Sequence, residues 1–168
     1  DPSEKESINT ILREHGMIPA EELTLLNRYS MACPAFPTCG LSITESERAI
    51  EGILEELEGE MRTLGIIEEK IALHMTGCPN GCARPYVPDI GLVGKAKDKY
   101  TVFLGGNAEG TRVNYIYKDL VPRAEILSTL RPAFTHFKDE REVGESFGNF
   151  CHRIGQEEMQ AHAESFGS

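Results

Sequence analysis

Two pairs of closely spaced cysteines constrain this chain more than any other feature of its sequence. Cys33 and Cys39 enclose the segment PAFPT, and Cys78 and Cys82 enclose PNG. Segments so rich in Pro and Gly do not continue a helix or a strand, so each cysteine pair is expected on a tight turn. The fold therefore has to accommodate two thiol-bearing turns that lie far apart along the chain.

The spacing of the cysteines leaves several kinds of thiol chemistry open. Zinc sites prefer two to four residues between paired ligands, which the C-x3-C pair satisfies and the C-x5-C pair does not. A fifth cysteine, Cys151, makes the number odd and argues against a pure disulfide framework. Gly77 and Gly81 each precede a thiol, where glycine lets the backbone approach a bulky group and aim N–H groups at sulfur. The pattern favours an iron–sulfur cluster over zinc, disulfides or unliganded thiols.

Composition narrows the class of protein. The chain has 168 residues, 40% of them hydrophobic, and a formal net charge of −10. This size and apolar content suit a single domain with its own core. The acidic balance argues against a nucleic-acid partner, and no stretch approaches the about 20 apolar residues of a membrane span. The first residue is not Met and no signal peptide is visible, so we interpret the chain as a fragment of a longer protein.

Periodicity predicts alternating helices and strands. A capping box at Thr44–Glu47 predicts a long helix that ends at Gly65. Further helices are predicted over residues 4–15, 19–26 and 122–137, with Pro132 breaking or kinking the last, and near 143–155. Strands are predicted before Cys33 and over residues 70–77, 89–95 and 99–106, the last two as a hairpin, while 112–121 fits either state.

These elements predict one α+β domain over residues 1–168. We expect a mixed sheet of about four or five strands with helices packed mainly on one side. The cysteine turns would lie where strand ends meet. Residues 156–168 are polar and are expected to form a flexible tail.

Two stretches resemble the cluster motifs of the siroheme-containing nitrite and sulfite reductases. They are CPAFPTCG (33–40) and HMTGCPNGCARPYVPDIGLVGK (74–95), and the wording is similar to the assimilatory sulfite reductase hemoproteins rather than to the nitrite branch. LGGNAEGTR (104–112) and FKDEREVGESFGNFCHRIG (137–155) resemble the C-terminal region of the same family. The likeness covers about residues 20–155 and implies the 4Fe–4S domain fold of these reductases.

The resemblance implies a set of cofactor ligands. Cys33, Cys39, Cys78 and Cys82 would hold a [4Fe–4S] cluster, and Cys82 would also bridge to the iron of a siroheme. Asn80 and Arg84 would contact heme carboxylates or cluster sulfurs; the alternative makes Asn80 a turn residue and Arg84 a surface ion pair. His74 is read as a core histidine, and Cys151 matches no ligand position.

The resemblance also implies a function for the longer protein. That protein would be an oxidoreductase that reduces sulfite to sulfide with six electrons, supplied by ferredoxin or a flavoprotein. Its location would be the cytoplasm, or a plastid if the parent carries a transit peptide. The substrate-binding basic residues of the family lie in segments outside this chain, so the fragment alone is expected to be inactive. A nitrite reductase domain, a stand-alone iron–sulfur electron-transfer module and a zinc-binding interaction domain remain as alternatives.

Overall fold

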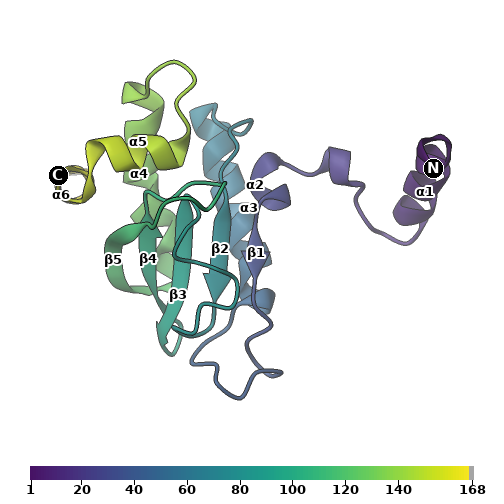
Figure 1. The fold of residues 1–168 in the computed structure, drawn as a ribbon, viewed down its shortest axis with the longest axis horizontal. Helices are drawn as coiled ribbons and strands as arrows, with labels where there is room; N and C mark the ends of the chain where they lie inside the picture. Colours follow the sequence, from purple (N-terminus) through teal and green to yellow (C-terminus); the bar gives the residue numbers. More distant parts are fainter. Residues whose placement is uncertain (167–168) are drawn as a thin grey trace.

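A mixed β-sheet forms the centre of the molecule (Figure 1). The structure, a computed structural model, describes residues 1–166, and within them the sheet has five strands in chain order. Neighbours β1 to β3 are parallel, and β3 to β5 are antiparallel. The strands are β1 (Met31–Ala32), β2 (Leu73–Thr76), β3 (Ile90–Ala96), β4 (Lys99–Leu104) and β5 (Tyr115–Pro122).

The helices gather mainly on one face of this sheet. Figure 1 shows α3 and α4 behind the strands, α5 across the upper end, and α1 standing away from the body. This arrangement confirms the predicted α+β architecture. The helical elements are η1 (Pro2–Glu4), α1 (Lys5–Glu14), η2 (Ala20–Glu22), α2 (Leu25–Arg28), α3 (Glu47–Leu64), η3 (Arg123–Glu125), α4 (Ile126–Glu140), α5 (Phe147–Ile154) and α6 (Gln156–Ser165).

The core lies between the sheet and its helices. Alternate residues of each strand face it, because side chains of a strand point to opposite faces in turn. Leu73 and Met75 of β2 and Val102 of β4 are fully buried there, against Leu57 of α3 and Phe134 of α4. The remaining residues of each strand point to the second face of the sheet. The loop between β2 and β3, which contains the second cysteine pair, covers part of this face.

Two local predictions differ from the structure at the start of α3 and at Pro132. The capping box is wrong: the N-cap is Ser46, and its hydroxyl donates to the Met75 carbonyl instead of receiving a helix N–H. Thr44 accepts a hydrogen bond from the Asp98 amide at 3.1 Å. A tertiary contact to β2 and one to the β3–β4 turn outweigh local capping. Pro132 lies inside α4, which continues on both sides of it, so of the two predicted outcomes the break does not occur.

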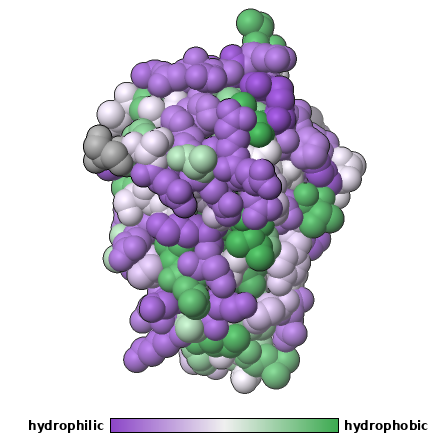
Figure 2. Space-filling model, turned by 90° about the vertical axis from the view of Figure 1, so that its left-hand side faces the viewer, coloured by the Kyte–Doolittle hydropathy of each residue, from purple (hydrophilic) through white to green (hydrophobic). Residues whose placement is uncertain are grey.

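The segment expected to be a flexible tail forms helix α6 over Gln156–Ser165. Met159 is buried, and the His162 ring stacks on His136 of α4 with ring centroids 4.0 Å apart. The Gln160 amide donates to the carbonyls of Ile116 and Tyr117 on β5. Figure 2 shows this side of the molecule, where polar residues cover much of the surface. The remaining residues, 167–168, lie outside the described part.

Candidate functional site: two cysteine loops at one sheet edge

The first cysteine pair lies directly after β1. Cys33 still belongs to the parallel ladder, because its amide donates to the Met75 carbonyl at 3.1 Å. The Cys33 carbonyl in turn accepts the amide of Glu47, the first residue of α3. Cys39 closes the turn by donating its amide to Ala35 O at 2.7 Å. The backbone of this pair is thus fixed to the sheet at one end and to a helix N-terminus at the other.

The second pair lies after the neighbouring strand, β2. Because β1 and β2 are parallel, their carboxyl ends reach the same edge of the sheet, at the lower end in Figure 1. Gly77 joins the two loops: its amide points at the Cys33 sulfur at 3.3 Å, and its carbonyl accepts the amides of Ile43 and Thr44. The prediction that the two cysteine turns lie together at the ends of strands is therefore confirmed.

Gly77 is required where the loops meet. A Cβ atom at this position would lie 2.8 Å from the Ala35 Cβ and closer still to Ser42 Oγ and the Thr44 carbonyl. Only glycine allows this approach. The sequence predicts that Gly77 lets the backbone approach a bulky group. In the structure, Gly77 lets the two cysteine loops approach each other, while its N–H points at the Cys33 sulfur.

The four thiols differ in exposure. Cys78 is buried, Cys33 and Cys39 are half-buried, and Cys82 is exposed. All four are free thiols. Within residues 1–166, no three His, Cys, Asp or Glu side chains lie close enough together to hold one metal ion. A four-iron cage takes one thiolate on each iron, so its ligands are spaced more widely than those of a single ion. Four thiols on two loops that meet at Gly77 are the donor set that such a cage uses, and these residues fit it.

The loop between Cys82 and β3 folds back over the second face of the sheet. The Pro85 carbonyl lies over Gly91 of β3, where a Cβ would overlap it. Asn114 donates its amide to the carbonyls of Pro85 at 2.8 Å and of Pro88 at 3.2 Å. Sequence reasoning missed Asn114, because a buried amide that satisfies distant carbonyls leaves no local signal.

Asn80, between Cys78 and Cys82, and Arg84, two residues after Cys82, both lie on the surface. Arg84 has φ 51°, and its amide donates to Gly81 O at 2.8 Å. The Arg84 carbonyl accepts from His74 Nδ1 at 3.2 Å. Burial lowers the pKa of His74, so the ring stays neutral with its proton on Nδ1. His74 thus braces the loop backbone, whereas both the Asn80 and Arg84 side chains are exposed and free to face a further group.

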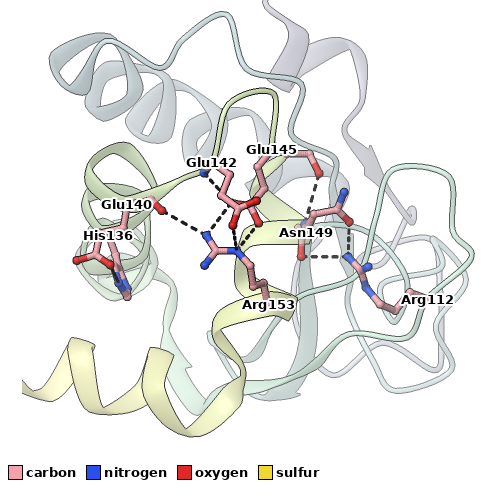
Figure 3. A network of polar contacts seen from close by, with 9 residues as sticks. Arg112, His136, Glu140, Glu142, Glu145, Asn149 and Arg153 are labelled. Carbon is pink, nitrogen blue, oxygen red and sulfur yellow. Dashed lines mark hydrogen bonds and ion pairs between the residues drawn. The ribbon is translucent and has the colours of Figure 1, made fainter.

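A second polar cluster lies at the opposite edge of the sheet, around the start of α5. Asp89 is buried and accepts the amides of Ala72 at 2.8 Å and Gly148 at 3.0 Å. Arg112 donates to the carbonyls of Gly105, Gly106 and Gly148 and to Asn149 Oδ1. Figure 3 shows Arg112 facing Asn149, and Arg153 clasping the carboxylates of Glu142 and Glu145.

Cys151 belongs to this second cluster and not to the cysteine loops. It is fully buried in α5, and burial raises the pKa of its thiol well above the usual range. The Tyr115 hydroxyl donates to its carbonyl at 3.0 Å. The structure therefore separates Cys151 from the four cysteines of the loops.

Comparison with known proteins decides the family. Residues 26–166 match the family described as the nitrite and sulphite reductase 4Fe-4S domain. The chain belongs to this family. Its sequence is 42% identical to a sulfite reductase [ferredoxin] of Synechococcus elongatus over 98% of the chain and 26% of that protein. It is 44% identical to the sulfite reductase [NADPH] hemoprotein beta-component of Staphylococcus haemolyticus over 92% of the chain and 27% of that protein.

A solved structure shares the fold of this reductase domain. The NirA protein of Mycobacterium tuberculosis superposes with a TM-score of 0.73 at 22% identity, over 94% of this chain and 30% of that one. The family and fold predicted from the cysteine motifs are confirmed. The chain spans about a quarter of the length of the curated relatives described above. No helix within the described residues is long and apolar enough to cross a membrane.

Proposed function

We propose that this chain is the part of a sulfite reductase hemoprotein that would hold a [4Fe–4S] cluster and would supply the Cys82 thiolate to the iron of a siroheme. The observation that carries the proposal is the meeting of the two cysteine loops at one edge of parallel strands, with Gly77 in contact with Cys33. Family membership and the sulfite reductase relatives support the same assignment.

Each of the four cysteines takes a distinct place in this proposal. Cys33, Cys39 and Cys78 are partly or fully enclosed, which suits thiolates that serve the cluster alone. Cys82 is exposed, which suits a thiolate that must also reach a second cofactor. Asn80 and Arg84 flank it on the same surface and would contact the cofactors' polar groups. The Gly77 N–H would hydrogen-bond the Cys33 thiolate, and such hydrogen bonds tune the reduction potential of a cluster.

The cofactors, when bound, would supply one-electron steps, of which the reduction of sulfite to sulfide needs six. This chain's own contribution is to fix the four sulfurs, with Cys78 buried and Cys33 and Cys39 half-buried. The remainder of the reductase chain would bind the substrate, so the chain alone is inferred to be inactive. The electron donor would be ferredoxin or a flavoprotein; the two relatives named above carry ferredoxin and NADPH in their names. Five free thiols suit a reducing compartment, the cytoplasm or a plastid.

The test is an absorption spectrum with iron and acid-labile sulfide analysis of the full-length protein that carries this chain. We expect four cluster irons, four sulfides and one siroheme per chain. Zinc without iron would replace the proposal with an interaction domain, and a cluster without siroheme would replace it with an electron-transfer module. Steady-state assays with sulfite and nitrite then separate the two branches of the family, with a higher kcat/KM for sulfite expected.

A further inference from the structure

Tyr86 has contacts on both sides of the turn that separates Cys78 from Cys82. Its hydroxyl donates to the Pro79 carbonyl at 2.8 Å. Its ring lies against Gly81, where an added Cβ would be 2.8 Å from the Tyr86 Cε2 atom. One side chain therefore touches two of the three residues between the thiols.

The Tyr86 ring is itself held in place by the sheet. It packs edge-to-face on Phe103 of β4, with ring centroids 5.4 Å apart and an interplanar angle of 89°. β4 is a central strand, paired on both sides by β3 and β5. The turn is thereby connected through an aromatic pair to the most rigid part of the fold.

The Gly81 carbonyl of the turn accepts the Arg84 amide at 2.8 Å, whereas the Pro79 carbonyl accepts its hydrogen bond from the Tyr86 side chain. Gly81 has φ +71°, and glycine in that region is the most mobile kind of residue. Cys78 is buried and lies two residues after β2, whereas Cys82 is exposed. The position of Cys82 thus depends on how firmly Pro79 and Gly81 are held.

We propose that Tyr86 is a positioning residue that sets the direction of the Cys82 thiol by clamping the 78–82 turn to the sheet. This inference rests on the function proposed for the cysteines. Loss of the hydroxyl frees the Pro79 carbonyl and lets the turn sample more than one geometry. The thiolate of Cys82 then no longer presents one fixed direction to its two cofactors.

The experiment compares Tyr86→Phe with Tyr115→Phe in the full-length protein. Both substitutions remove one tyrosine hydroxyl that donates to a backbone carbonyl, at 2.8 Å and 3.0 Å respectively, but Tyr115 serves Cys151 at the opposite edge. The readouts are the EPR spectrum and midpoint potential of the reduced cluster, the rate of iron loss to a chelator, and amide hydrogen exchange over residues 79–84.

For Tyr86→Phe we expect iron loss and exchange over residues 79–84 to rise about fivefold, since a hydrogen bond of ordinary strength is lost from a local opening equilibrium. We also expect a second EPR component and a shifted midpoint potential. Tyr115→Phe should leave the EPR spectrum, the potential and exchange at 79–84 as in wild type, even if it lowers Tm as much.

Wild-type exchange rates, EPR spectrum and potential in Tyr86→Phe would overturn the proposal. A wild-type protein that holds no iron would overturn the proposed function instead. In that case the exchange measurement still decides whether Tyr86 clamps the turn: unchanged exchange over residues 79–84 refutes the clamp, and faster exchange supports it.

Discussion

The two edges of the central sheet are built on opposite plans. At the carboxyl edge of β1 and β2, four thiols sit on Gly- and Pro-rich loops, and one of them, Cys82, is exposed. At the other edge, the buried polar groups are almost fully partnered: Asp89 accepts two backbone amides, and Arg112 donates to three carbonyls and Asn149. One edge leaves a thiol exposed, and the other commits most of its polar groups to hydrogen bonds within the fold.

This difference separates the effects that substitutions should have. Substitution of the exposed Cys82 should act mainly on the cofactors, because an exposed loop side chain contributes little to the core. Changes at the Asp89–Arg112 edge should lower stability and affect the cofactors only through loss of folded protein.

The strongest test replaces cysteines at the two edges in the full-length protein. Cys82→Ser should reduce sulfite reduction by more than about 100-fold, since even substitutions around metal ligands cost 10- to 100-fold, and should lower Tm by no more than cofactor removal lowers it in wild type. Cys151→Ala should keep full cofactor content and activity and lower Tm instead. Activity, iron content and thermal unfolding are measured side by side; a normal rate in the Cys82 variant would contradict the bridging role.

The second test introduces a methyl group at the start of α5. The Cβ of Gly148→Ala would overlap the Gly106 carbonyl and the Asp89 carboxylate. We expect this chain to lose about 3 kcal/mol of unfolding free energy or more, because neither backbone nor buried carboxylate can move aside. The control is Gly59→Ala, at an exposed position of α3 where nothing lies within 4 Å of an added Cβ. This substitution should raise the unfolding free energy by about 0.5–1 kcal/mol. Urea unfolding compares them.

The third test uses the pH dependence of stability. Burial raises the pKa of Asp89 to about 6 from an ordinary value of 3.8. Between these values the folded state binds a proton that the unfolded state has released, so the contribution of Asp89 to stability falls as pH rises through this window. The fall is at most about 3 kcal/mol, at 1.36 kcal/mol per pKa unit.

Asp89→Asn provides the reference for this measurement. The difference in unfolding free energy between wild type and variant should shift in favour of the variant as pH rises from about 4 to 7. Burial is the main cause that lowers the pKa of His136, so the contribution of His136 to stability falls as pH drops below 6.5. His136 titrates in both proteins, so this contribution cancels in the difference between wild type and variant. A pH-independent difference would show that Asp89 keeps an ordinary pKa.

The smallest expected effect concerns the cover that α6 gives to the edge strand. Gln160→Ala removes the donor to the Tyr117 carbonyl and one of two donors to the Ile116 carbonyl, which Gln156 also bonds, and should cost about 1 kcal/mol. Glu157→Ala, an exposed change on the same helix, should stay within about 0.5 kcal/mol. If both variants unfold at the same urea concentration, the glutamine contacts contribute nothing to stability.

The sequence predicted those parts of the molecule that depend on local patterns. Ile53, Leu57 and Met61 recur at helical spacing and mark the buried face of α3, and the apolar runs that became β3 and β4 formed the expected hairpin. The spacing of the cysteines and the Gly and Pro between them pointed to the family. Each of these signals lies within a few residues of what it predicts.

Contacts between distant segments lay beyond the sequence. Ser46 stands at the N-cap of α3 but bonds Met75, residues 115–122 of the ambiguous segment became strand because β4 offered an edge, and residues 156–165 became helix because α4 and β5 offered a surface. Local sequence places the four thiols and the turns that carry them. The meeting of the two loops at Gly77 and the contacts of Tyr86 with one of them depend on distant segments, because parallel pairing of β1 with β2 and the register of β4 place those atoms together.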